Sequence, residues 1–167
     1  MHHGELKFQE LVSDYKDRIY RLSWSFVRNE ADCDDLVQNI LIKIWKNFDS
    51  FRNQSSIGTW IYKISLNTII DFTRKNKFPQ SISSNNRIEN LHIIDETSDI
   101  EDSYIHDERL TILNTCINRL SLIERTLITL YLEDLKYGEI ADILGISEKS
   151  VSVRIVRIKH KMNKMLK

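Results

Sequence analysis

Residues 136–151 decide what kind of fold this chain has. They read Lys136-Tyr137-Gly138-Glu139-Ile140-Ala141-Asp142-Ile143-Leu144-Gly145-Ile146-Ser147-Glu148-Lys149-Ser150-Val151. The small Ala141 allows two helices to approach closely, Gly145 can adopt the positive φ of a tight turn, and Ser147 can cap the helix that follows. These features predict a helix-turn-helix that binds DNA. An ordinary helical hairpin with a solvated basic face is the alternative, but the combination favours DNA binding.

The helix after this turn has two distinct sides. Its predicted inner stripe is Val151, Ile155, Ile158, Met162 and Met165. The N-terminal outward positions are expected to meet base edges, and the later basic residues are expected to meet phosphates. The candidate duplex-binding residues are Lys149, Ser150, Ser152, Val153, Arg154, Val156, Arg157 and Lys161.

Helical patterning extends over most of the chain. Only one Pro and four Gly occur among 167 residues, which disfavours an all-β fold. Apolar residues recur at three- and four-residue steps over residues 5–28, 29–48, 56–75 and 110–120, with Asn29 as a plausible N-cap. Ser121 and Glu124 have the spacing of a capping box, which predicts another helix through residue 132. The class predicted is therefore all-α.

The charge distribution divides the chain. The formal net charge is zero, yet residues 89–108 hold eight acids and no Lys or Arg, and residues 148–167 hold seven Lys/Arg against one acid. The acidic stretch has no apolar period and is flanked by Ser- and Asn-rich sequence. We therefore predict two small helical domains, residues 1–77 and 105–167, joined by a flexible acidic linker at residues 78–104.

The sequence argues against several other classes of protein. The acids of the linker have no His or Lys at acid–base or metal-like spacing, and the chain contains no Gly-rich phosphate loop. We therefore expect no catalytic residue, no metal, no cofactor and no small-molecule substrate. Apolar runs are shorter than a membrane span needs, which predicts a cytoplasmic protein. Cys33 and Cys116, far apart in the sequence, are expected to be reduced and packed in the interior.

Two segments of the N-terminal half resemble a known family. Asp35-Leu36-Val37-Gln38-Asn39-Ile40-Leu41-Ile42-Lys43-Ile44-Trp45 is similar to the D-L-V-Q-E-x-F-x-x-x-W segment of extracytoplasmic-function sigma factors. Trp60-Ile61-Tyr62-Lys63-Ile64-Ser65-Leu66-Asn67-Thr68-Ile69-Ile70-Asp71-Phe72-Thr73-Arg74 resembles their W-L-Y-R-I-A-x-N-x-x-x-D-x-x-R helix. Residues 136–154 resemble the family's S-Y-x-E-I-A-x-x-L-G-I-S-x-x-T-V-x-S-R segment. The order and spacing match over nearly the whole chain outside the linker.

The resemblance implies the function and the partners. Such proteins bind core RNA polymerase and direct promoter recognition, strand opening and transcription initiation. The resemblance implies that residues 1–77 bind the polymerase and recognise and melt the minus-ten element, and that the helix-turn-helix of residues 105–167 recognises the minus-thirty-five element. The partners implied are the β′ clamp helices and the β subunit of core RNA polymerase, promoter DNA, and an anti-sigma factor that is anchored in the membrane. The polymerase-binding residues implied are Asp35, Leu36, Gln38, Asn39 and Ile42. Asn39 departs from the family, which usually has Glu there.

The resemblance also assigns a surface for the minus-ten element. The family uses a loop and one Asn to hold a base flipped out of the non-template strand, here the loop Arg52, Asn53, Gln54 and Ser55 together with Asn67. A stripe at steps of four, four and three continues this surface with Lys63, Asp71 and Arg74, followed by Lys75. Trp60 and Tyr62 are candidates for stacking on DNA, with core packing favoured for Trp60.

The match is imperfect in the last helix. Ser150 replaces the family's usual Thr, and Ser152 and Val153 stand where the family has a basic residue and Ser. The promoter sequence therefore cannot be transferred from the family. A stand-alone helix-turn-helix transcriptional regulator is the main alternative, but it leaves both N-terminal motifs without a use. A helical adaptor that binds only protein is a further alternative, and DNA dependence would distinguish it.

Overall fold

The computed structural model describes residues 2–27, 29–77 and 108–167 of the chain. In these residues the regular structure consists of seven α-helices and one 3-10 turn, without strands, which confirms the all-α prediction. The chain divides into two compact units, residues 1–83 and 84–167. The predicted linker, residues 78–104, lies entirely outside the described residues, so its boundaries stay a prediction.

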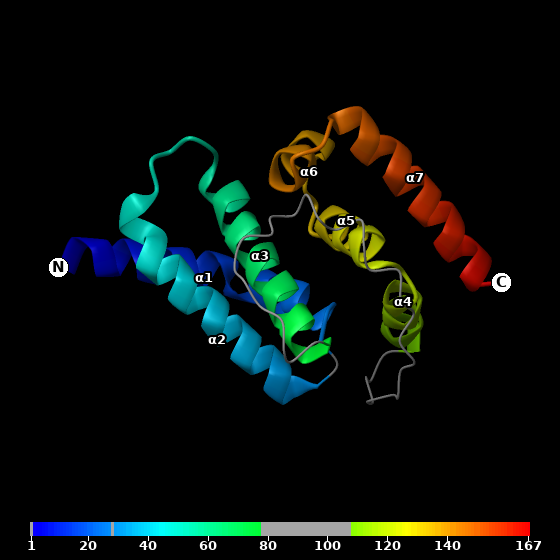
Figure 1. Cartoon of the computed structure of the whole chain (residues 1–167), viewed down its shortest axis with the longest axis horizontal. Coiled ribbons are helices and arrows are strands. Elements are labelled where there is room, and N and C mark those ends of the chain that lie inside the picture. Colours follow the sequence, from blue (N-terminus) through cyan, green and yellow to red (C-terminus); the bar gives the residue numbers. More distant parts are fainter. Residues whose placement is uncertain (1, 28, 78–107) are drawn as a thin grey trace. The chain divides into compact units, whose positions relative to one another are not determined.

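The first unit contains three long helices and a short turn. They are α1 (His2–Trp24), α2 (Glu30–Asn47), η1 (Phe48–Ser50) and α3 (Ile57–Lys77). Helix α2 packs against both α1 and α3, and α1 also contacts α3 (Figure 1). Buried side chains from all three helices form the core: Ile19, Leu22, Leu36, Ile40, Ile44, Ile61, Leu66 and Ile69. Burial of these aliphatic side chains is the main force that stabilises the unit.

Helix α1 ends four residues earlier than the apolar pattern predicts. Phe26 and Val27 are buried, but their backbone N–H groups both donate to the carbonyl of Ser23, which tightens the chain into a turn. The Ser25 hydroxyl donates to the carbonyl of Arg21 in the same region. The apolar pattern therefore extends beyond the end of α1, because the turn that follows the helix also buries its side chains.

The starts of α2 and α3 are set by side chains that cap them. The Asn29 side chain accepts a hydrogen bond from the backbone N of Asp32, as predicted. Ser56 plays the same part for α3, since its hydroxyl oxygen accepts from the backbone N of Thr59 at 3.1 Å. Gly58 lies against α1, where an added Cβ would come within 2.8 Å of the Tyr15 hydroxyl. A side chain at position 58 would therefore require the Tyr15 side chain to shift.

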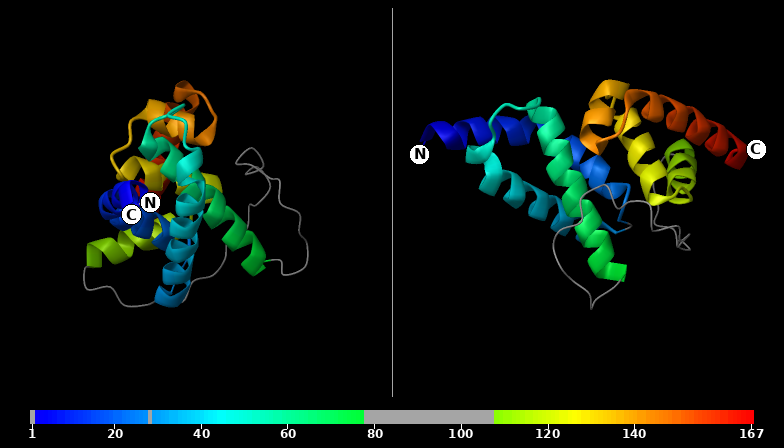
Figure 2. Two further views of the ribbon diagram at one scale, coloured as in Figure 1. Left: turned by 90° about the vertical axis from the view of Figure 1, so that its left-hand side faces the viewer. Right: turned by 45° about the horizontal axis from the view of Figure 1, so that its top comes forward.

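The second unit contains the helix-turn-helix. Its elements are α4 (Glu108–Asn118), α5 (Leu122–Leu132), α6 (Tyr137–Leu144) and α7 (Glu148–Met165). Helix α7 packs on α4, α5 and α6, and it is the long helix that runs to the C-terminus in Figure 2. The capping box of Ser121 and Glu124 is present, Gly145 has φ +68°, and the Ser147 hydroxyl accepts from the backbone N of Ser150. These three local predictions are confirmed.

Both cysteines are buried thiols, as the sequence predicts. Burial, reinforced by the nearby carboxylate of Asp34, raises the pKa of Cys33 to about 11. The thiolate is the reactive form, so Cys33 is chemically quiet at neutral pH. No helix in the described part of the chain is long and apolar enough to cross a membrane.

Candidate functional site

The outward face of α7 carries the predicted duplex-binding residues. Val151, Ile155, Ile158 and Met162 are buried against the unit. Lys149, Val153, Val156 and Arg157 lie on the opposite side and are exposed. Ser150, Ser152 and Arg154 are half-buried on its flanks, and Arg154 Nε donates to Ser150 Oγ at 3.2 Å. The helix therefore presents a mixed apolar and cationic surface to its surroundings.

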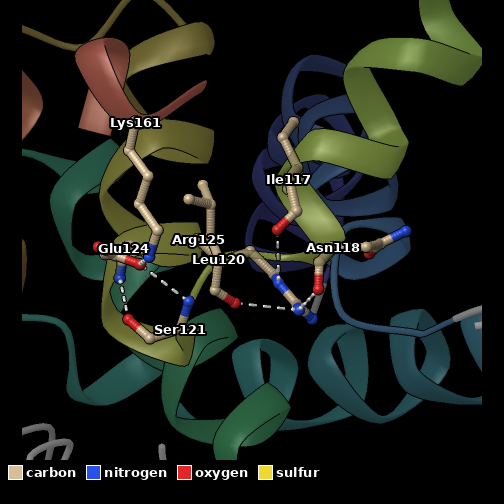
Figure 3. Close-up of polar contacts among 7 residues, drawn as sticks. All are labelled: Ile117, Asn118, Leu120, Ser121, Glu124, Arg125 and Lys161. Atoms are coloured by element: carbon tan, nitrogen blue, oxygen red, sulfur yellow. Dashed lines mark hydrogen bonds and ion pairs between the residues drawn. The ribbon is translucent and has the colours of Figure 1, made fainter. Parts of the chain in front are cut away.

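Lys161, the last of the predicted duplex-binding residues, also forms an ion pair within the second unit. Its Nζ lies 2.8 Å from Glu124 Oε2, and the same carboxylate oxygen accepts from the backbone N of Ser121 at 3.0 Å (Figure 3). Burial opposes ionisation of Glu124, but the hydrogen bonds from Lys161 and Ser121 outweigh it and hold its pKa below the usual range. Lys161 thus joins α7 to the start of α5 and is only partly available to a phosphate.

Lys159 makes a comparable link that the sequence did not indicate. Its Nζ donates to the Tyr131 hydroxyl at 2.6 Å and lies 3.9 Å from the centroid of the Tyr131 ring. This contact combines a hydrogen bond with a cation–π interaction. Two of the lysines near the end of α7 therefore contact α5, whereas Lys149 and Arg157 belong to the exposed face.

The turn between α4 and α5 is held by a single guanidinium. Arg125 donates to the backbone carbonyls of Ile117, Asn118 and Leu120 at 3.3, 2.8 and 3.3 Å (Figure 3). Carbonyls at the end of a helix lack intrahelical donors, so Arg125 satisfies the carbonyl of Asn118, the last residue of α4. The contact orients α4 relative to α5, on which α7 is packed.

The predicted minus-ten surface lies on α3 and on the loop before it. Asn67, Asp71 and Lys75 are exposed on α3. Lys63 and Arg74 are half-buried on the same helix. The loop appears in Figure 1 as the arch between η1 and α3. Arg52, Asn53 and Gln54 are exposed in this loop, and Ser55 is half-buried. Asn53 has φ +54°, a left-handed conformation that Asn tolerates better than most residues.

Two contacts shape this surface. The Phe51 and Trp60 rings pack with centroids 5.0 Å apart, which joins the loop to α3. Asp71 Oδ2 lies 3.6 Å from Lys43 Nζ of α2, so one predicted DNA-contacting residue already pairs with a cation. An exposed pair of this kind contributes about 0–1 kcal/mol, so its exchange for another partner is easy.

Two sequence assignments are corrected by burial. Tyr62 is buried in the core of the first unit, so its ring is not available for stacking on DNA. Leu36 is fully buried between the helices, so it stabilises α2 and offers no surface to a partner. The reason is the same in both cases, since α2 and α3 each have neighbours on two sides. Trp60 is half-buried, as the preference for packing implied.

The remaining residues of the predicted polymerase surface are exposed on α2. They are Asp35, Gln38, Asn39 and Ile42. Ile42 is 48% exposed. The same surface includes Trp45, which is 46% exposed and which was named from the sequence only as the last residue of the family motif. Steps of three, four and three relate Asp35, Gln38, Ile42 and Trp45, and this register was the signal that could have placed Trp45 on the surface.

An aromatic cluster supports Trp45 from α1. The Phe8 ring meets Trp45 edge-on at 4.7 Å between centroids and Phe48 at 5.9 Å. The α2 face thus ends in an apolar area that carries side chains from two helices. Exposed apolar side chains gathered in this way are typical of protein–protein contact sites.

The fold and these surfaces define a class: a two-unit helical protein with a helix-turn-helix in the second unit. Family models match both units, Sigma-70 region 2 over residues 11–78 and Sigma-70 region 4 over residues 110–162. The chain belongs to the extracytoplasmic-function type of the sigma-70 family, whose members direct RNA polymerase to promoters. The match to region 2 disfavours the alternative of a stand-alone helix-turn-helix regulator.

Relatives and solved structures agree with this family. RNA polymerase sigma factor SigV of Bacillus subtilis (strain 168) is 33% identical over 87% of this chain and 82% of its own length. ECF RNA polymerase sigma factor SigW of the same organism is 31% identical over 96% and 89%. The fold resembles the sigma factor RpoE from Bartonella quintana, solved in complex with the anti-sigma factor NepR, with a TM-score of 0.73, 21% identity, and 96% of each chain covered. CnrH, solved with the cytosolic domain of CnrY, gives a TM-score of 0.71 at 24% identity, covering 97% of this chain and 88% of that one.

Proposed function

We propose that this sigma factor docks on the β′ clamp helices of core RNA polymerase through the exposed face of α2. The observation that carries the proposal is the line of Asp35, Gln38, Ile42 and Trp45, where two large apolar side chains are about half exposed beside polar ones. An apolar centre with a polar rim is the usual composition of a protein interface. Asn39 lies at the rim, and its neutral amide forms weaker contacts than the carboxylate usual in the family.

The second part of the proposal assigns strand opening to α3 and its preceding loop. Residues 52–55 and Asn67 hold a base of the non-template strand after it leaves the stack. Lys63, Arg74 and Lys75 neutralise the phosphates beside it, while Asp71 positions Lys43. Capture of an unstacked base offsets part of the few kcal/mol that unpairing costs, so strand separation needs no ATP.

The third part assigns duplex recognition to α7. Lys149, Ser150, Ser152, Val153, Val156 and Arg157 face the minus-thirty-five element, and Arg154 supports them through Ser150. Lys161 contributes by holding α7 on α5, with a share in phosphate contacts. The support for this assignment is the one-sided exposure of the helix and the capped turn that precedes it.

The proposal includes partners and setting. The chain acts without a catalytic residue or cofactor of its own, and its place is the cytoplasm, where RNA polymerase meets promoter DNA. The β subunit forms a further contact in the assembled polymerase. An anti-sigma factor, anchored in the membrane, holds the chain inactive. Two structures similar to this chain support that last partner, since each contains a second protein, named in one as an anti-sigma factor.

The α2 face is tested by reversing its chemistry. We expect Ile42→Glu combined with Trp45→Ala to weaken binding to core polymerase by about 100-fold or more, because hot-spot residues of an interface contribute about 2 kcal/mol or more each. Competition for core polymerase, measured with a fluorescently labelled reference sigma factor, gives the affinity. Leu132→Glu is the matched control, since Leu132 on α5 has the same 48% exposure as Ile42. Equal affinity of both variants for core polymerase would contradict the docking assignment.

A further inference from the structure

Two valines stand on the outermost line of α7. Val153 is 42% exposed and Val156 is 62% exposed, on the side opposite the buried Val151, Ile155 and Ile158. Their side chains face away from the core, so burial does not explain them. Valine also restricts its own side chain in a helix and forms helices less readily than alanine. Single exposed apolar residues are common, but these two are neighbours on one line of one helix.

The surroundings of the two valines are those of a duplex-binding surface. Lys149, Val153, Val156 and His160 follow one another at steps of four, three and four, and all are exposed. Arg157 is exposed next to Val156. Cations beside the valines can hold phosphates and bring the centre of the helix to the base edges. The valines then occupy the position in which a helix reads bases.

The chemistry of valine limits what it can recognise in the major groove. Its side chain has no donor or acceptor, so it cannot pair with the nitrogen and oxygen atoms on base edges. The apolar group that the major groove offers is the C5 methyl of thymine. The two positions are about 4.5 Å apart along the helix axis, close to the rise of about 3.4 Å between base pairs.

We infer that Val153 and Val156 contact thymine C5 methyl groups at two neighbouring positions of the minus-thirty-five element. The inference rests on the proposed role of α7 and names the bases that it selects. Removal of one contacted methyl should weaken binding about fourfold, the change expected for exposing one buried methyl-sized group. A 5-methylcytosine carries the same methyl in the same groove and should replace thymine in part.

The test uses the full chain assembled with core RNA polymerase. Promoter duplexes randomised over the minus-thirty-five element are selected for binding. The selected duplex is then made with uracil in place of each thymine in turn. We expect thymine at two neighbouring positions, and a loss of about fourfold for uracil at each. In the double variant Val153→Ala, Val156→Ala, uracil and thymine should bind equally at these positions.

A control and three outcomes make the test decisive. Ile112→Ala removes a similarly exposed apolar side chain from α4 and should leave the preference for thymine unchanged. Equal binding of uracil and thymine duplexes by the unmodified chain would contradict the inference but not the proposed role of α7. A loss of binding to uracil duplexes that persists in the alanine variant would have the same consequence. If the holoenzyme selects no sequence at the minus-thirty-five element, the proposed role of α7 fails together with the inference.

Discussion

At the scale of single residues, the proposed function of Asn67 depends on its position and exposure. It lies on α3 one helical turn from Lys63 and one from Asp71, and its amide is exposed rather than packed. An amide offers a donor and an acceptor together, which suits the edge of an unpaired base. In the loop that precedes α3, the exposed Asn53 has a left-handed backbone conformation. These features favour Asn67 as the residue that holds a flipped base.

Replacing Asn67 with Ala should reduce open-complex formation by about tenfold, within the 1–3 kcal/mol expected for loss of a two-point base contact. The loss should persist on DNA that is already unpaired at the minus-ten element, because the base contact itself is gone. Rates of open-complex formation by the holoenzyme, on duplex and on pre-melted templates, measure both effects. Gln9→Ala on α1 removes another exposed amide and should have no effect. Full recovery on pre-melted DNA would show instead that Asn67 acts before the strands separate.

The turn between α6 and α7 shows how an element depends on local conformation. Gly145 ends α6 with φ +68°, and its N–H and that of Ile146 both donate to the carbonyl of Ala141. This is the common left-handed end of a helix, which satisfies carbonyls that the helix leaves open. Lys159 and Lys161 then hold α7 on α5. The orientation of α7 thus depends on the backbone conformation of Gly145 and on the contacts of Lys159 and Lys161 with α5.

Gly145→Ala should destabilise the second unit by about 1 kcal/mol. An added Cβ meets no atom within 4 Å, so the cost comes only from the left-handed backbone, which disfavours alanine. Urea unfolding followed by circular dichroism measures the free energy of unfolding. Gly4→Ala is the matched control, because Gly4 lies in α1 without a positive φ and its Cβ also meets nothing within 4 Å. Since alanine favours a helix more than glycine does, this variant should be at least as stable as the unmodified chain. Equal stability of the two variants would show that the turn adapts without strain.

At the scale of the whole molecule, the net charge hides the function. The formal charge is zero, but seven Lys and Arg are concentrated in residues 148–167 against one acid. Electrostatic attraction to DNA is governed by the local charge and not by the average. The two units have separate proposed surfaces for DNA, and α2 has a proposed surface for the polymerase. A molecule with this arrangement is expected to act only when its partner is present.

We therefore expect the isolated chain to bind promoter DNA weakly and to leave it double-stranded. Addition of core polymerase should produce thymines near the transcription start that react with permanganate, which modifies unpaired bases. The physical reason is that each DNA surface is small, and the polymerase supplies further contacts and holds both surfaces on one promoter. Specific nanomolar binding to an operator by the chain alone, without transcription in the reconstituted system, would contradict this expectation.

The sequence by itself determined the helical class, the order of the helices and several of the residues that begin or end them. Asn29, the pair Ser121 and Glu124, Gly145 and Ser147 were all identified correctly. Each depends on contacts within about four residues along the chain, which are encoded locally. The exposed face of α7 followed from the same periodicity, whereas the α2 residues were implied by the family resemblance.

Only the tertiary structure decided which apolar side chains are covered. Leu36 and Tyr62 are buried while Trp45 is exposed, although all three belong to helical apolar or motif positions. The contacts of Lys161 with Glu124, 37 residues apart, were equally beyond the sequence pattern. A helical period shows which residues share a face, but the neighbours in space determine which faces are buried, and these neighbours come from distant parts of the chain.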